Sequence, residues 1–291
     1  MAFKSVFSSM KQEGLIKQID QYLLTRHTDG DRANVTNSPS SALGCVRANY
    51  YQRSNTPREP VDGRVQRIFD NGHGMHERIQ GYLRDMGVLL MDEVPLMNED
   101  YEIQGHTDGI LAVVKKRLDW VRVLELKSIN GRGFQALREP LEKHKAQAQV
   151  YLFCAEEQRL YLQKKYPTLL EFKRSALARR KMYRKKYLHL EDGEKWTRGQ
   201  KINFKVNQHM MMDEILYHVK KPIEEAVVLY ECKDTQNMKE YVIKMDEVLM
   251  DEVLYKFEQS NEAWDKKKLP PRECKNKSEG RFCNFVNTCF E

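Results

Sequence analysis

The sequence predicts an α/β fold in which a central mixed β-sheet is flanked by helices. Two features carry this prediction: apolar strand-like segments that form two hairpins, and longer segments with helical spacing before, between and after them. A chain of 291 residues can bury a substantial core, and its length fits one large domain. We therefore expect residues 1–291 to form a single domain.

The chain is expected to begin with helices. Apolar residues between positions 3 and 26 have a roughly helical spacing that Gly14 interrupts, and a polar, turn-rich loop follows at 27–41. Serines in this loop signal a helix at about 42–53. A longer helix, weakened locally by two glycines, is expected at about 64–86.

The first hairpin is predicted between Asp108 and Leu126. Ile110 to Val114 completes its first strand, Lys115 to Arg117 is the solvated turn, and Trp120 to Leu126 is the returning strand. This register allows Asp108 to lie beside Glu125.

The rest of the chain predicts further helices and a second hairpin. They are a helix at about 139–156, a basic helical region at 160–190, a helix at 208–221, a hairpin with strands at 226–232 and 240–245, and a helix at about 246–266. The domain then divides into an N-terminal helical part (1–63), a core (64–160), a basic helical region (161–225), a second hairpin with its helix (226–268) and a cysteine-rich tail (269–291).

The returning strand of the first hairpin carries the chemistry. Side chains alternate along a strand, so Glu125 and Lys127 share one face while Leu124 and Leu126 point into the opposite layer. Asp108 and Glu125 offer hard oxygen ligands for Mg²⁺ or Mn²⁺, and the lysine could position a water molecule or offset charge on a phosphate. This is the minimal set for metal-dependent phosphodiester hydrolysis.

The Glu-x-Lys triplet alone has little specificity, because it recurs in this lysine-rich chain. The other copies are Glu171/Lys173, Glu231/Lys233 and Glu273/Lys275. Only the copy at Glu125 ends an apolar strand that follows an Asp-Gly pair. A plain strand at the edge of the sheet remains the alternative interpretation.

Basic residues give the chain a formal net charge of +7, and many of them lie in one helical segment. They are Lys173, Arg174, Arg179, Arg180, Lys181, Arg184, Lys185 and Lys186. Such a segment is either a solvated helix face or a surface that follows the phosphates of a nucleic acid. The neighbouring hydrolytic residues favour DNA as the partner.

The six cysteines are not expected to form disulfides, because the chain looks intracellular. No apolar run approaches membrane-spanning length, and the first residues are too polar for a secretory signal. Cys154 and Cys232 fit ordinary burial. The tail cysteines are Cys274, Cys283 and Cys289, and with Cys45 they could hold an iron–sulfur cluster or zinc; free thiols are the alternative.

Several segments, in this order, resemble the RecB-like branch of the PD-(D/E)XK nucleases that carries an iron–sulfur cluster and includes CRISPR-associated and phage-encoded exonucleases. They are Ser41-x-Leu43-x-Cys45-x-Arg47-x-x-Tyr50-Tyr51, Gly72-x-x-x-His76-Glu77, Gly105-His106-Thr107-Asp108-Gly109, Leu124-Glu125-Leu126-Lys127, Gln147-x-x-x-Tyr151, Val228 to Lys233, Leu269-Pro270-Pro271 and the C-terminal cysteines. The resemblance covers about residues 41–291 and implies a restriction-endonuclease-like core.

By this resemblance, His76, Asp108, Glu125 and the carbonyl of Leu126 would coordinate the catalytic metal, and Lys127 would position the water. Gln147 and Tyr151 would organise the site or touch DNA. His73 lies close enough to His76 in the sequence to compete for its role. Without the family, His76 would be interpreted as a helix histidine with satisfied hydrogen bonds, and Tyr151 as a core residue.

The resemblance also implies that Cys45, Cys274, Cys283 and Cys289 ligate a [4Fe-4S] cluster that joins the N-terminal part to the tail. Eight residues separate Cys274 from Cys283, whereas the family usually has two. The interval between Cys283 and Cys289 does fit. Zinc, or a lost cluster, therefore stays open as an alternative.

The expected function is that of a divalent-metal-dependent DNA nuclease, an exonuclease that acts on DNA ends or single strands in recombination, repair or phage DNA metabolism. A recombination or replication protein is a further expected partner, and the cytoplasm, or the host cytoplasm for a phage protein, the expected location. Two alternatives are a non-catalytic nucleic-acid- or protein-binding module that keeps the fold and an RNA-directed nuclease.

Overall fold

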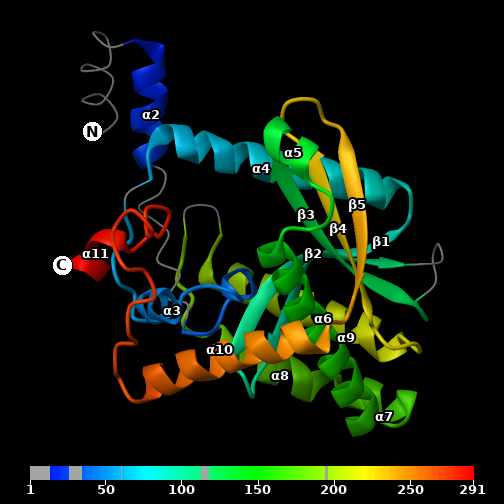
Figure 1. Ribbon diagram of the computed structural model, residues 1–291. Helices are drawn as coiled ribbons and strands as arrows, with labels where there is room; N and C mark the ends of the chain where they lie inside the picture. The colour runs from blue at the N-terminus through cyan, green and yellow to red at the C-terminus, as the bar shows by residue number, and fades with distance from the viewer. Residues whose placement is uncertain (1–13, 26–34, 60, 113–117, 194–195) are drawn as a thin grey trace.

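The computed structural model describes residues 14–25, 35–59, 61–112, 118–193 and 196–291. Within these residues, five strands form one mixed sheet in the order β1-β2-β3-β4-β5. The strands are β1 (Leu89–Asn98), β2 (Ile103–Ala112), β3 (Val121–Ile129), β4 (Glu225–Cys232) and β5 (Met238–Lys244). The expected α/β class with a central mixed sheet is confirmed (Figure 1).

Both predicted hairpins are present, and the sheet has one strand that the sequence did not predict. β2 and β3 are antiparallel with Gly109 opposite Leu124, while the predicted turn at 115–117 lies outside the described residues. β4 pairs with β5 in antiparallel and with β3 in parallel, which makes the sheet mixed. The additional strand is β1, which pairs with β2 at the edge of the sheet.

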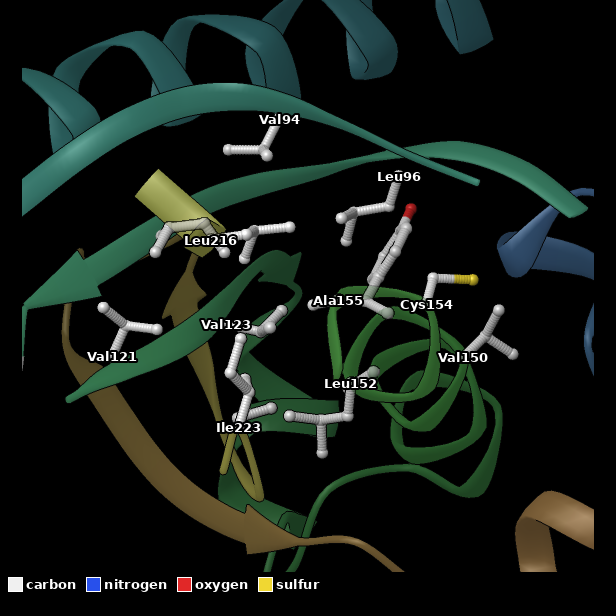
Figure 2. Close-up of a cluster of buried hydrophobic side chains, with 14 of the residues drawn as sticks. Val94, Leu96, Val121, Val123, Val150, Leu152, Cys154, Ala155, Leu216 and Ile223 are labelled. Atoms are coloured by element: carbon white, nitrogen blue, oxygen red, sulfur yellow. The ribbon is translucent and has the colours of Figure 1, made fainter. Parts of the chain in front are cut away.

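The main hydrophobic core lies between the sheet and helices α6 (Glu142–Lys165), α9 (Arg198–His218) and α10 (Glu247–Asp265). Figure 2 shows Val94, Val123 and Leu152 among the side chains where strands and α6 meet. All three are fully buried. Cys154 of α6 and Cys232 of β4 are also buried, as the sequence predicted.

The other face of the sheet is covered by helix α4 (Gly63–Asp85), whose Met75 and Ile79 pack on Leu124 and Leu126 of β3. Asp62 begins this helix by accepting a hydrogen bond from the backbone N–H of Val65 at 2.7 Å. The predicted alternation along β3 is confirmed, since Leu124 and Leu126 pack under α4 while Lys127 reaches Gln147 of α6 on the opposite face. That opposite face is covered by α6, so Glu125 is buried there and not solvated.

The remaining helices are α2 (Leu15–Thr25), η2 (Pro39–Ser41), α3 (Val46–Arg53), α5 (Gly131–Ala136), α7 (Leu169–Arg174), α8 (Ala176–Lys186) and α11 (Val286–Phe290). The part of the first predicted helix at 3–13 lies outside the described residues. α9 begins ten residues before the predicted start at 208, because Thr197 and Gln200 form a capping box there. The basic region is divided into α7 and α8.

The tail after α10 packs against α3 and the segment that follows it (Figure 1), where the backbone N–H of Glu59 donates to the carbonyl of Asn284 at 2.8 Å. The backbone N–H of Val46 donates to Glu273 at 2.8 Å, and Arg47 donates to the carbonyl of Pro270 at 3.0 Å. The rings of Tyr51 and Phe285 also lie in contact. Among the described residues, no helix has the length and apolar character needed to cross a membrane.

Candidate metal centre

Three potential metal ligands come together where α4 crosses β1 and β2. His76 of α4, Glu93 of β1 and Asp108 of β2 each place one ligand atom within 4.8 Å of the other two. His76 and Asp108 were predicted, whereas Glu93 was not. Imidazole nitrogen and carboxylate oxygen are suitable donors for Mn²⁺, and the carboxylates also suit Mg²⁺.

Asp108 is held in place from three sides. Its Oδ1 lies 3.0 Å from Nδ1 of His76, and its Oδ2 accepts a hydrogen bond from the backbone N–H of Leu126 at 2.6 Å. Gln80 of α4 donates both to the backbone carbonyl of Asp108 at 2.9 Å and to Oε1 of Glu93 at 3.2 Å. These contacts orient the ligand set, as outer partners of metal ligands commonly do.

The strands are distorted at this point. Asp92 pairs with Gly109 and Val94 with Thr107, so Glu93 lies opposite Asp108. Glu93 has a positive φ of 45°, which is uncommon for a residue other than glycine. Its strand loses the regular alternation there, and Met91 and Val94 both enter the main core. Unusual backbone angles of this kind cluster at functional sites.

Glu125 and Lys127 form the second half of the site on β3. Lys127 Nζ lies 2.5 Å from Oε1 of Glu125 and donates to Oε1 of Gln147 at 3.0 Å. Gln147 in turn donates to the hydroxyl of Tyr151, one turn further along α6, at 3.2 Å. Oε2 of Glu125 is buried without a hydrogen-bond partner. This free lone-pair acceptor fits a role as metal ligand.

The site shifts the protonation of its own groups. Burial, together with the negative charge of Asp108, raises the pKa of Glu125 to about 7, and the charge of Lys127 only partly offsets this. Burial is the largest effect on the pKa of His76 and lowers it, but the hydrogen bond to Asp108 and the negative charges of Asp108 and Glu125 together outweigh burial and leave the pKa raised. A bound divalent cation would replace the protons that these groups hold.

We expect Glu125→Gln to stabilise the metal-free protein at pH 8 and to change its stability little at about pH 4. The pKa of Glu125 is higher in the folded chain than its usual value of 4.5. The favourable contribution of the protonated carboxyl to the free energy of unfolding is therefore fully present below pH 4.5. That contribution is lost as pH rises through about 7, because the charged carboxylate is then buried. The glutamine carries no charge at any pH.

Urea denaturation in the presence of a chelator measures this effect as the free energy of unfolding at both pH values. Glu252→Gln, at an exposed position of α10, is the matched control and should behave like the wild type at both. Equal stability differences for Glu125→Gln at the two pH values would contradict the assigned pKa.

The structure separates residues that the sequence grouped together. His73 is exposed and does not belong to the ligand group, whereas His76 does. Tyr151 is 3% exposed beneath Gln147, so the prediction that it touches DNA is wrong and it supports the site instead. Coordination by the carbonyl of Leu126 stays a prediction.

Arg179 also requires a correction. Its side chain is buried, and Nη1 donates to Oδ2 of Asp213 at 2.7 Å, so it is a structural residue and not a DNA contact. The other predicted DNA contacts are exposed on α7 and α8: Lys173, Arg174, Arg180, Lys181, Arg184 and Lys185.

Two residues near Lys127 had not been predicted as part of the site. Tyr230 of β4 lies opposite Lys127 in the parallel ladder, and its hydroxyl lies 2.8 Å from Nδ1 of His144. Burial, aided by the charge of Lys127, lowers the pKa of His144 to about 3. His144 therefore stays neutral and adds no second positive charge beside the lysine.

The four predicted cluster cysteines lie in the contact region between α3 and the tail. None of the four is in a disulfide, and all are partly buried. Burial raises the pKa of Cys274, and the nearby Cys283, Glu279 and Cys289 add smaller effects in the same direction. Cys45 begins α3 and lies beside Glu273. Burial raises the pKa of the Cys45 thiol, and the negative charge of Glu273 adds a smaller effect in the same direction.

Comparisons with known proteins do not assign a family. No family model matches the chain, and no curated protein matches it. Among the solved structures that match is one described as "Crystal structure of SSO0001", with 15% sequence identity, 96% of each chain covered and a TM-score of 0.47. Similarity at this level carries no functional inference.

Proposed function

We propose that the protein is a divalent-metal-dependent nuclease of the PD-(D/E)XK type that cleaves DNA. The observation that carries the proposal is the convergence of His76, Asp108 and Glu93 beside the buried Glu125–Lys127 pair. Acidic ligands next to a positioned lysine suit hydrolysis of a phosphodiester, where negative charge accumulates on the phosphate.

The residues divide into ligands and supports. His76, Asp108 and Glu125 would hold Mg²⁺ or Mn²⁺. His76, Asp108 and the exposed Glu93 form the group whose ligand atoms lie close together, whereas Glu125 lies outside that group and would add its buried, unpartnered Oε2. The metal would supply an activated water and offset charge on the phosphate. Lys127, held between Glu125 and Gln147, is placed to donate a hydrogen bond to that water or to the phosphate.

The exposed cations of α7 and α8 support DNA as the substrate. Contacts of this kind go to phosphates and not to bases, so they favour sequence-independent binding that weakens steeply with salt. Arg180 and Lys181 are examples, and both are exposed.

The test is degradation of linear single-stranded and double-stranded DNA in the presence of Mn²⁺ or Mg²⁺, with chelator as the control. We expect cleavage that depends on the metal. DNA binding without any cleavage would instead favour a non-catalytic module, and faster cleavage of a matched RNA would favour an RNA-directed nuclease.

We also propose that Cys45, Cys274, Cys283 and Cys289 hold a [4Fe-4S] cluster. Two observations support this proposal. Cys274 lies near enough to Cys283 and Cys289 for these thiols to affect its pKa, and Cys45 lies beside Glu273, the residue that precedes Cys274. Thiolates of this kind are ligands for iron–sulfur clusters and for zinc, so zinc stays the alternative.

We expect anaerobically purified protein to be brown and to contain iron and sulfide, and Cys283→Ser to lose most of both. Cys232→Ala is the matched control, because this thiol is buried in β4 away from the tail, and it should retain the iron. Colourless wild-type protein that contains zinc would contradict the cluster and support the zinc alternative.

A further inference from the structure

Two aromatic side chains are exposed next to one another at the start of α9. Trp196 is 42% exposed and Phe204 is 45% exposed. Their ring centroids lie 5.0 Å apart with the planes at 88°, an edge-to-face contact that holds the two rings in fixed relative positions. Neither ring enters one of the hydrophobic clusters of the described residues. Their exposed surface is therefore open to a ligand.

Cations outnumber carboxylates along α9 beside the ring pair, and the nearby carboxylate of Asp192 is engaged by the backbone N–H of Arg198 at 2.5 Å. The sequence from Lys195 to Met212 contains no acidic residue. Lys205 Nζ lies 6.0 Å from the centroid of Phe204. Arg180 of α8 donates to Oδ1 of Asn207 at 3.0 Å, which brings the exposed basic face of α8 beside the same side of α9. An anionic ligand is favoured at such a surface.

The aromatic pair is connected to the metal centre. Gln208 lies one helical turn after Phe204 and donates to the backbone carbonyl of Glu93 at 3.3 Å. Lys205 Nζ lies 3.2 Å from Nε2 of His106, two residues before Asp108 on β2. One turn of α9, a rise of about 5.4 Å, therefore separates Phe204 from a residue that contacts the ligand group.

We infer that Trp196 and Phe204 are a stacking site for the unpaired bases of a single-stranded nucleic acid, whose backbone continues past Lys205 to the metal centre. This inference rests on the proposed nuclease function and adds the class of substrate to it. Bases stack on aromatic rings irrespective of sequence, whereas bases paired inside a duplex do not expose their faces. Rings and cations together bind a single strand through both its bases and its phosphates.

The test measures binding of fluorescein-labelled oligo(dT) by fluorescence anisotropy, in a chelator so that no cleavage takes place. We expect Trp196→Ala and Phe204→Ala each to weaken binding by about tenfold or more, the loss typical of one stacked base. Phe204→Trp should retain the affinity. Tyr255→Ala removes an aromatic ring that is 61% exposed on α10, and it should leave binding unchanged.

An abasic oligonucleotide of the same length separates stacking from attraction to phosphates. The two alanine variants should bind it as the wild type does, while Lys205→Ala should weaken binding of both ligands. Unchanged binding of oligo(dT) by Trp196→Ala and Phe204→Ala would overturn the inference, as would an equal loss with the abasic strand.

The change in oligonucleotide binding is measured without cleavage, so it tests the stacking site separately from catalysis. Loss of oligo(dT) binding in a protein that shows no metal-dependent cleavage would support the stacking site and overturn the proposed nuclease. Intact cleavage together with unchanged binding by both variants would overturn the stacking site alone.

Discussion

Asp108→Asn and Glu125→Gln are each expected to lower the rate of Mn²⁺-dependent DNA cleavage by about a thousandfold or more. Each change keeps the size of the side chain but removes a charged ligand. Metal ions supply several kcal/mol of transition-state stabilisation, and each 1.36 kcal/mol corresponds to a factor of ten in rate. Initial rates on a labelled single strand, at saturating metal, provide the measurement.

Glu252→Gln is the control for these variants, since it removes an exposed carboxylate from α10. It should cleave at the wild-type rate. Lys127→Ala should also lose activity, because Lys127 lies between Glu125 and Gln147. Equal cleavage rates for the wild type, Asp108→Asn, Glu125→Gln and Lys127→Ala would end the catalytic proposal.

Asp213→Ala is expected to lower the free energy of unfolding by about 3–5 kcal/mol, since it leaves a buried guanidinium without its counter-charge. Asp213 is fully buried, and Arg179 is only 4% exposed. Tyr183 and Gln158 also donate to Oδ1 of Asp213, at 2.8 and 2.9 Å. Urea denaturation of the wild type and the variant measures the loss.

Two further variants make this prediction specific. Glu214→Ala removes the next carboxylate along α9, which is exposed, and should change the free energy of unfolding by no more than about 0.5 kcal/mol. The double variant Arg179→Met with Asp213→Leu should recover most of the loss, because no unpaired charge then remains. A loss below about 1 kcal/mol in Asp213→Ala would show that Arg179 can reach solvent.

The parts of the site that could be predicted from sequence lie on segments with regular periodicity. Leu124 and Leu126 alternate with Glu125 and Lys127, and this pattern predicted the strand on which the charged pair lies. Helical spacing likewise predicted α4, which carries His76, and most of α6, which carries Gln147.

β1 could not be predicted in this way, because its pattern is irregular. Its alternation is broken at Glu93, where φ is positive, and Pro95 removes a backbone donor from this edge strand. Glu93 itself follows Asp92 in a chain with many acidic residues, so it had no distinguishing signal. Only the pairing of β1 with β2 brings it opposite Asp108.

Burial of single residues in the basic region depends on partners that lie far away in the sequence. Arg179 and Arg180 are neighbours on α8, and the sequence gives no reason to separate them. Arg179 is buried because Asp213, 34 residues later on α9, accepts from it, whereas Arg180 faces solvent. Such a distinction follows from tertiary packing and not from local pattern.

The proposed nuclease requires that His76, Asp108 and Glu125 bind a divalent cation. Calorimetric titration of Mn²⁺ into the full chain, at pH 8 and without DNA, tests it directly. We expect saturable binding by the wild type and by Glu252→Gln, and loss of that binding in Asp108→Asn. Absence of Mn²⁺ binding by the wild type, or undiminished binding by Asp108→Asn, would contradict it.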